Sequence, residues 1–136
     1  MDKIFSSSHS LELLKIGARY LERLEVADAR AEADLLLAHV LGITRAKLYL
    51  ETNLEVPAEK RNRFSELLKK RGQREPLAYL LKTREFMGLE FYVDQNVLIP
   101  RPETELLVEK LLEMRKNKAR RNPVRILDLC TGSGSI

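Results

Sequence analysis

Apolar residues recur at intervals of three and four positions through the first 74 residues, which is the spacing of amphipathic helices. The first such segment begins at Ser10, a residue type that caps helices. The second begins at Asp28, another capping type, and ends at Gly42, which suits the left-handed conformation at a helix C-terminus. The expected inner faces carry Leu11, Leu14, Ala18, Leu21 and Leu24 in the first helix, and Ala31, Leu35, Ala38 and Leu41 in the second.

Two further helices complete this region. Thr44 is expected to open a short helix that runs through Leu50. Pro57 stands where a first-turn proline is tolerated, so a fourth helix is expected to begin there. Residues 10–74 are therefore predicted to form a small helical bundle. The apolar face of its fourth helix, which precedes Gly72, consists of Phe64, Leu67 and Leu68.

The pattern changes after this bundle. Residues 85–93 read Glu-Phe-Met-Gly-Leu-Glu-Phe-Tyr-Val, a run of β-favouring residues around Gly88 that predicts a tight β-hairpin. A short apolar run at 97–99 ends at Pro100. Pro102 is then expected to be the first residue of another helix, with acidic side chains in its first turn where the helix dipole favours them. This helix carries Leu106, Leu107, Leu111 and Met114.

The last 13 residues read Val-Arg-Ile-Leu-Asp-Leu-Cys-Thr-Gly-Ser-Gly-Ser-Ile. Residues 124–129 are typical of a parallel strand buried on both faces. Gly132 and Gly134 follow in a small-residue loop, which is how doubly wound α/β folds bring backbone close to a nucleotide-like ligand. The acidic residue Asp128 at the strand end can accept hydrogen bonds from backbone amides or from the ligand. We favour a cofactor loop over a bare turn, although nicotinamide, flavin and S-adenosyl-L-methionine (SAM) enzymes share a Gly-x-Gly.

Length and composition limit the alternatives. A chain of 136 residues suffices for one domain, or for a small domain and part of another. Its contents of 44% hydrophobic and 32% charged residues are those of a folded soluble protein. No apolar run approaches the roughly 18 to 20 residues of a membrane span, and residues 1–10 lack the apolar segment of a secretory signal. Because Cys130 is the only cysteine, no internal disulfide can form, and we expect a cytoplasmic protein without a membrane partner.

The net charge of +4 is concentrated in two basic clusters. Each could face RNA or an acidic protein, but a solvated helix face and a solvated linker are the commoner reading of such runs. No aromatic residues interleave with the second cluster as base-stacking platforms, so no direct nucleic-acid substrate is expected. The first cluster is Lys60, Arg61, Arg63, Lys69, Lys70, Arg71 and Arg74; the second is Arg115, Lys116, Lys118, Arg120, Arg121 and Arg125.

Two reactive side chains have a plain structural interpretation. His39 lies beside the stripe of the second predicted helix, with no second histidine or cysteine near it to make a metal site. Cys130 is either a reactive thiol or a small packed side chain. We favour the second, because no base is placed beside it in the sequence. No metal is expected.

Three segments of the chain resemble the N5-glutamine methyltransferases of the HemK/PrmC type, which modify peptide chain release factors. The first is Pro-Leu-Ala-Tyr-Leu-Leu at 76–81, followed by Glu85 and Phe86. The second and most specific is Leu-Ile-Pro-Arg-Pro-Glu-Thr-Glu at 98–105. The third, Ile-Leu-Asp-Leu-Cys-Thr-Gly-Ser-Gly at 126–134, is similar to SAM motif I. The resemblance covers nearly the whole chain.

The resemblance implies a mainly α N-terminal bundle, a β-hairpin connector and the truncated start of a Rossmann-like α/β methyltransferase domain. The corresponding domains are 1–74 for recognition of the protein substrate, 75–101 for the linker with its hairpin, and 102–136 for the incomplete catalytic part. Arg101, Thr104 and Glu105 either line the pocket or, for the last two, cap the helix. Phe86 and Phe91 either wall the site or pack in a core. The residues implied to contact SAM are Cys130, Thr131, Gly132, Ser133 and Gly134, with Asp128 supporting the loop.

The same resemblance implies a mechanism. An amide nitrogen is a poor nucleophile because its lone pair is delocalised into the carbonyl. In the family an Asn-Pro-Pro-Tyr motif holds the glutamine amide toward the SAM methyl group, so catalysis rests on positioning and electrostatics. That motif, and an acidic residue about 20 positions after the loop that would hold the ribose, do not occur in these 136 residues. We therefore expect no catalytic residue in the chain and no activity from it alone.

The chain departs from the family pattern at Lys82 and Cys130, where glycine is commoner. Three alternatives stay open. The first is the sister activity on a ribosomal-protein glutamine, although Pro-Glu-Thr-Glu after Arg101 favours release factors. The second is a non-catalytic module that only binds a release factor. The third is a poorly folded gene remnant whose apolar residues 124–136 promote aggregation.

Overall fold

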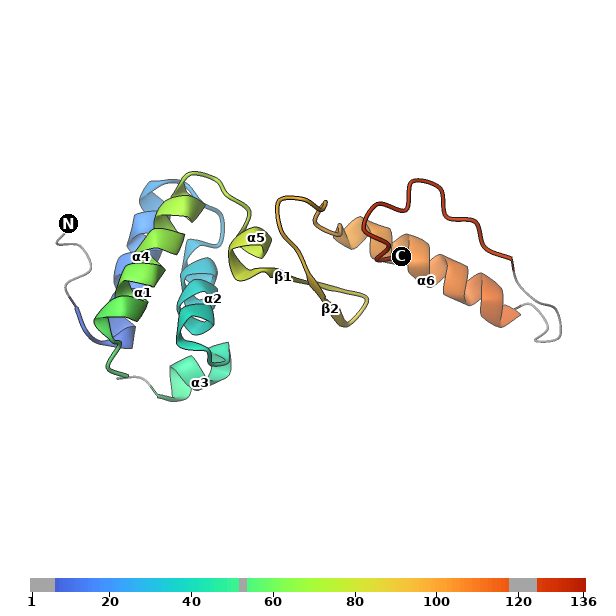
Figure 1. Cartoon of the computed structure of the whole chain (residues 1–136). Coiled ribbons are helices and arrows are strands. Elements are labelled where there is room, and N and C mark those ends of the chain that lie inside the picture. The colour runs from blue at the N-terminus through green and yellow to red at the C-terminus, as the bar shows by residue number, and fades with distance from the viewer. Residues whose placement is uncertain (1–6, 52–53, 118–124) are drawn as a thin grey trace. The chain divides into compact units, whose positions relative to one another are not determined.

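Helices make up most of the computed structural model, which describes residues 7–51, 54–117 and 125–136 and divides into two units at Leu81 and Lys82 (Figure 1). The first unit is the predicted helical bundle, and the second contains the predicted antiparallel hairpin. The domain boundaries implied by the resemblance, 1–74, 75–101 and 102–136, remain a prediction. The elements are α1 (Ser10–Arg23), α2 (Ala29–Leu41), α3 (Arg45–Leu50), α4 (Ala58–Gly72), α5 (Leu77–Leu81), β1 (Thr83–Phe86), β2 (Leu89–Tyr92) and α6 (Pro102–Asn117).

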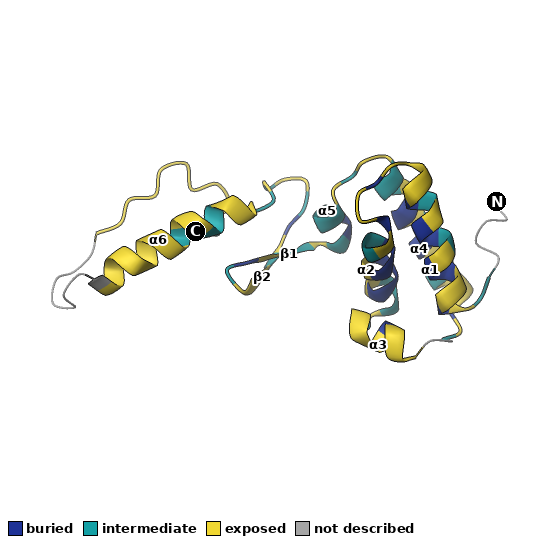
Figure 2. Cartoon of the chain, turned by 180° about the vertical axis from the view of Figure 1, so that it is seen from behind, coloured by how far each residue is buried: buried dark blue, intermediate teal, exposed yellow. Residues whose placement is uncertain are grey.

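The core of the first unit lies where α1, α2 and α4 face one another, and Figure 2 shows their buried sides in dark blue. The fourth helix contributes the three residues predicted from its pattern, Phe64, Leu67 and Leu68. Helix α5, which the sequence pattern did not reveal, adds Leu80. Burying these side chains is the main favourable term for folding of this unit. Helices α1, α2 and α3 and the loops after α1 and α3 contribute Leu13, Leu14, Ala18, Leu21, Val26, Ala29, Ala33, Leu36, Leu37, Ala38, Leu48 and Val56.

The predicted inner faces of the first two helices were partly wrong. Leu11 and Leu24 of the first stripe and Leu35 of the second are exposed, whereas Leu13 and Leu36 are fully buried. Both helices carry leucines on more than one side, so spacing alone left the buried stripe ambiguous. In addition, α2 packs against α1, α3, α4 and α5, and a helix with several neighbours buries a broad arc and not a narrow stripe.

The predicted helix ends are more often correct in their position than in the capping interaction expected there. Thr44 caps α3, where its hydroxyl accepts a hydrogen bond from the Lys47 backbone N–H at 3.2 Å. Gly42 ends α2 in the left-handed conformation, with φ of 73°. Asp28 stands at the N-cap of α2 but makes no capping hydrogen bond, since its own backbone is left-handed.

Two expected helix starts were displaced by one residue. Ser10 is the first helical residue of α1, and its buried hydroxyl has no hydrogen-bond partner among the described residues. The start of α1 is displaced because the backbone before α1 pairs with the backbone before α4. The Ser10 N–H donates to the Leu54 carbonyl at 2.9 Å, and the Val56 N–H donates to the Ser8 carbonyl at 2.7 Å. Pro57 directly precedes α4 and is its N-cap, not its first residue.

A glycine allows α1 and α4 to approach closely. A Cβ placed on Gly17 would lie 2.9 Å from Cζ of Phe64 and 3.2 Å from Cδ1 of Leu68. Both neighbours are buried and have no room to retreat. The backbone of α1 at Gly17 is therefore part of the surface on which Phe64 packs.

The predicted hairpin forms, with Thr83 opposite Tyr92 and Phe86 opposite Leu89. Its two-residue turn, Met87 and Gly88, has positive φ at both positions, as in the type I′ turns that match the twist of paired strands. Lys82 precedes the hairpin with φ of 62°, and its carbonyl accepts a hydrogen bond from the Val93 N–H at 3.3 Å. The backbone here thus adopts a conformation that glycine tolerates better than lysine.

Helix α6 begins at Pro102 as predicted, but its leucines and its methionine lie exposed (Figure 2). The buried strand expected at 124–129 was wrong for the described residues 125–129, which form no strand, and residue 124 lies outside the described residues. Ile126, Leu127 and Leu129 are 83%, 81% and 76% exposed. The physical reason is that a strand needs a neighbour for its backbone hydrogen bonds, and the described residues supply none.

Within the described ranges, no helix combines the length and the apolar character required to cross a bilayer.

We predict that Gly17→Ala destabilises the chain by about 1–3 kcal/mol, although alanine favours helix by about 1 kcal/mol over glycine. The added methyl group would overlap the buried Phe64 ring. Chemical denaturation followed by circular dichroism measures the change. Gly72→Ala is the matched control, because the nearest atom there is the tip of the exposed Leu24 side chain, which can move aside. A stabilised Gly17→Ala variant would contradict the close approach.

We predict that Lys82→Gly stabilises the hairpin by about 0.5–1 kcal/mol. The gain is the relief of left-handed strain, reduced by the greater freedom of glycine in the unfolded chain. Hydrogen exchange of the backbone amides in residues 83–93 measures it. Lys82→Ala removes the same exposed side chain without relieving the strain, so it should not increase the protection of these amides above that of the unmodified chain. Equal protection in both variants would show that the lysine side chain, not its backbone, sets the stability.

Candidate functional site

The tip of the hairpin is tied to the start of α6. One carboxylate oxygen of Glu105, Oε1, accepts a hydrogen bond from the Met87 backbone N–H at 2.7 Å. The Phe86 and Phe91 rings meet edge to face at 6.2 Å between centroids, and Phe86 is buried. Glu105 therefore has a partner of its own on the hairpin, in addition to its position in the first turn of α6. This bond between distant segments could not be read from helix-capping patterns.

A small cavity of about 160 Å³ brings together three segments that the sequence singled out. They are the buried Phe86 of the hairpin, the run from Leu98 to Arg101 with Thr104, and the glycine loop. Of the possible pocket residues, Arg101 and Thr104 line this cavity and Glu105 does not. The loop contributes Cys130, Thr131, Gly132, Ser133, Ser135 and Ile136 to the lining, whereas Asp128 and Gly134 are not part of it.

The backbone of the glycine loop turns repeatedly through left-handed conformations. Positive φ angles occur at Cys130 (64°), Gly132 (58°) and Gly134 (75°). The turn is closed by a hydrogen bond from the Gly134 N–H to the Thr131 carbonyl at 3.0 Å. A Cβ on Gly134 would meet nothing within 4 Å, so the loop is open on that side. Small residues with accessible backbone suit the approach of a nucleotide-like ligand.

The loop is only one wall of such a site. Ligand pockets usually enclose about 300–1,000 Å³, so a cavity of 160 Å³ is too small for a molecule the size of SAM. The Asp128 carboxylate is exposed and makes no hydrogen bond within the described residues. The thiol of Cys130 is exposed rather than packed. The part of the chain that the structure describes holds no group of three or more side chains suited to a metal ion, and His39 is exposed.

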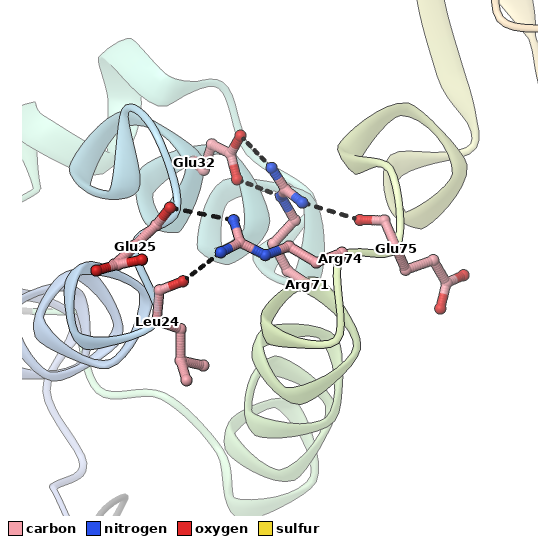
Figure 3. A network of polar contacts seen from close by, with 6 residues as sticks. All are labelled: Leu24, Glu25, Glu32, Arg71, Arg74 and Glu75. Carbon is pink, nitrogen blue, oxygen red and sulfur yellow. Dashed lines mark hydrogen bonds and ion pairs between the residues drawn. The ribbon is translucent and has the colours of Figure 1, made fainter.

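Most of the first basic cluster serves to join helices. Arg71 of α4 forms an ion pair with Glu32 of α2, with Nε 2.5 Å and Nη2 3.1 Å from the two carboxylate oxygens. Its remaining nitrogen, Nη1, donates to the Glu75 carbonyl at 3.3 Å. Arg74 donates to the carbonyls of Leu24 and Glu25 at the end of α1, at 2.8 and 3.1 Å (Figure 3). These two arginines therefore connect α4 to both α1 and α2.

The other members of this cluster are also engaged. Lys60 donates to the Leu41 carbonyl at 3.0 Å and Arg61 to the Ser7 carbonyl at 3.3 Å. Arg63 and Lys70 share Glu66, and the bond from Arg63 lowers the pKa of that carboxyl group. The reading of this run as a solvated helix face was therefore wrong for Arg71, whose side chain is largely buried. In the second cluster Arg115, Lys116 and Arg125 are exposed, and Lys118, Arg120 and Arg121 lie outside the described residues.

The sequence reading missed a buried carboxylate in α2. Asp34 is 1% exposed and accepts hydrogen bonds from Nε and Nη2 of Arg45, at 3.2 and 2.9 Å, and from the Tyr49 hydroxyl. Its hydrogen bond raises the pKa of the Arg45 guanidinium above its ordinary value. The sequence feature that could have revealed it is an acidic residue between Ala33 and Leu36, which are buried. A charge on an apolar helix face requires a partner.

The chain matches a known domain family over most of the helical unit. Residues 12–81 match the sequence model of the PrmC N-terminal domain. This range begins inside α1 and ends with α5, so it contains every core residue of the first unit.

Curated relatives match over a longer stretch. A release factor glutamine methyltransferase of Leptospira interrogans is 41% identical over 127 residues, which is 93% of this chain and 43% of the relative. Proteins of the same name from Clostridium botulinum and Nitratidesulfovibrio vulgaris are 38% and 40% identical over 92% and 96% of this chain. They are covered over 43% and 44% of their own length. The chain thus spans less than half the length of these relatives.

We predict that Arg71→Ala destabilises the chain by about 2 kcal/mol, because it leaves the largely buried Glu32 carboxylate without its charged donor. Thermal or chemical denaturation measures the loss. Arg63→Ala on the same helix is the matched control: its ion pair with Glu66 is exposed, so little or no loss is expected. Equal losses in the two variants would show that the link between α4 and α2 does not hold the bundle together.

Proposed function

This chain belongs to the PrmC N-terminal domain family, and we propose that it forms part of a SAM-dependent methyltransferase that modifies the glutamine side-chain amide of peptide chain release factors. The observation that carries the proposal is the identity of 41% to a release factor glutamine methyltransferase across 93% of the chain. A match of that extent continues beyond the helical bundle into the hairpin and α6. It therefore supports the activity and not only the recognition domain.

In this proposal the helical bundle recognises the release factor, and the second unit begins the Rossmann-like catalytic domain. The exposed apolar side chains of α6 and of residues 126–129 are consistent with that role, since both would be covered in a doubly wound domain with further strands. The protein would act in the cytoplasm, on a protein and without a metal ion.

The residues proposed to contact SAM are Cys130, Thr131, Gly132, Ser133 and Gly134, and their small side chains and left-handed backbone fit a nucleotide-like molecule. Asp128 would support the loop from the end of its strand. Arg101 and Thr104 would line the pocket, because they border the same cavity as the loop. Glu105 would hold the hairpin tip in place through Met87.

The chemistry of methyl transfer to an amide determines which further groups the active site needs. SAM supplies the methyl group as an electrophile. The glutamine amide nitrogen must be held with its lone pair toward that group. As the new N–C bond formed, the S–CH3 bond of SAM would break, the sulfur would leave as a neutral thioether with the bonding electron pair, and the nitrogen would pass one proton to an acceptor or to water. Acceptors for the amide hydrogens are needed for this orientation, and in the family the Asn-Pro-Pro-Tyr motif provides them. The described residues around the cavity place no such set of acceptors there.

We predict that the 136-residue chain transfers no methyl group from radiolabelled SAM to an unmodified bacterial release factor. A hybrid in which this chain replaces the matching part of the Leptospira relative should transfer methyl groups to it. Gly134→Leu in the hybrid should lower the rate by at least tenfold, because the side chain fills the open side of the loop.

The full-length relative is the positive control, and circular dichroism confirms that each hybrid is folded. A folded hybrid that leaves the release factor unmodified but methylates a ribosomal protein would favour the sister activity. A hybrid that binds the release factor without any transfer would favour a binding module.

A further inference from the structure

A groove of about 290 Å³ lies on the helical unit, on the side where α1, α2 and α3 border one another. Its apolar part comes from Leu11 and Leu14, and both Leu11 and Tyr49 are partly exposed in it. Lys15 and Arg19, one helical turn apart on α1, line it together with Arg30 of α2. The groove thus combines an apolar surface with three cations.

These cations differ from the others of the unit. Among the described lysines and arginines of α1 to α5, only Lys15, Arg19, Arg23 and Arg30 have side chains that make no hydrogen bond or ion pair with the described residues. Three of these four line the same groove. The basic run of α4, for which a surface facing RNA or an acidic protein was the less favoured interpretation of the sequence, is used within the fold. The free positive charge lies on another face.

The carboxylates of the groove do not neutralise this charge. Asp34 also lines the groove, but it already accepts hydrogen bonds from Arg45 and Tyr49. Glu22 lines it too and forms no ion pair within the described chain. The lining therefore carries three unpaired cations against one unpaired carboxylate, and it is complementary to an acidic ligand.

The chemistry of the groove favours a protein over a nucleic acid. The Tyr49 ring lies 6.0 Å from the Arg45 guanidinium, and its hydroxyl donates to Asp34, so this aromatic side chain is already engaged and is a poor base-stacking platform. Leu11 and Leu14 offer apolar contact of the kind that protein side chains use.

We propose that this groove docks an acidic surface segment of the protein substrate, in which several carboxylates flank an apolar side chain. The proposal rests on the proposed function for the identity of that protein, a release factor. Lys15, Arg19 and Arg30 would pair with the carboxylates, and Leu11 would cover the apolar side chain. Charges at the rim of an interface act mainly on the association rate and on its salt dependence.

The test is the affinity of the 136-residue chain for an unmodified bacterial release factor, measured by fluorescence anisotropy at several salt concentrations. The variant Lys15→Glu/Arg19→Glu/Arg30→Glu should bind at least tenfold more weakly, and its affinity should depend less on salt. The matched control Arg23→Glu/Lys47→Glu/Arg63→Glu changes the net charge equally on exposed residues outside the groove, and it should bind like the unmodified chain. Thermal unfolding shows whether both remain folded. If the reversal variant is unfolded, the glutamine substitutions at the same three positions replace it, with a smaller loss expected.

The possible outcomes separate this inference from the proposed function. Equal binding by both triple variants would overturn the groove and leave the release factor as partner. If the chain fails to bind the release factor but binds a Glu-Leu copolymer, with loss only in the groove variant, the groove stands and the partner is wrong. Binding of an RNA duplex in preference to both acidic probes, lost in the groove variant, would overturn the proposal.

Discussion

The packing of the Phe64 ring against the backbone of Gly17 sets the distance between α1 and α4, and the core of the helical unit depends on it. At this point a side chain on one helix occupies the space that a Cβ on the other would need. The buried leucines of α1 and α4 then meet those of α2, which lies against both helices. Because protein interiors are packed as densely as organic crystals, such a contact allows little variation in the position of either helix.

Charge pairing completes what apolar packing begins. Arg71 satisfies the largely buried Glu32 carboxylate, a group that would be costly to leave without a partner, and Arg74 donates to two carbonyls at the end of α1. The buried Asp34 carboxylate is satisfied in the same way, by hydrogen bonds from Arg45 and Tyr49. A run of cations along a helix therefore says little about binding until its internal partners are known. Within the described part of the helical unit, the cations that remain without internal partners lie on α1 and α2.

The sequence predicted the elements well where local chemistry decides them. The helix cap at Thr44, the left-handed Gly42 and the turn at Gly88 each follow from the conformations their residues prefer, and each is confirmed. The buried stripe of α2 could not be predicted in the same way, because leucines surround that helix and its several neighbours choose the face. The bond between Glu105 and Met87 joins residues 18 positions apart, which no periodicity reveals. At the candidate site the motifs identified the glycine loop, whereas the structure showed which residues share a cavity with it.

The two units also differ in what they require during synthesis. All the residues of the bundle core have been made once the ribosome has added Leu81, so this unit can bury its apolar surface while later residues are still being joined. Helix α6 and residues 126–129 differ, because the described residues do not bury most of their apolar side chains. The order of synthesis therefore lets the helical unit fold before α6 and residues 126–129 have been added, which shortens the time during which the nascent chain exposes two unfolded segments at once.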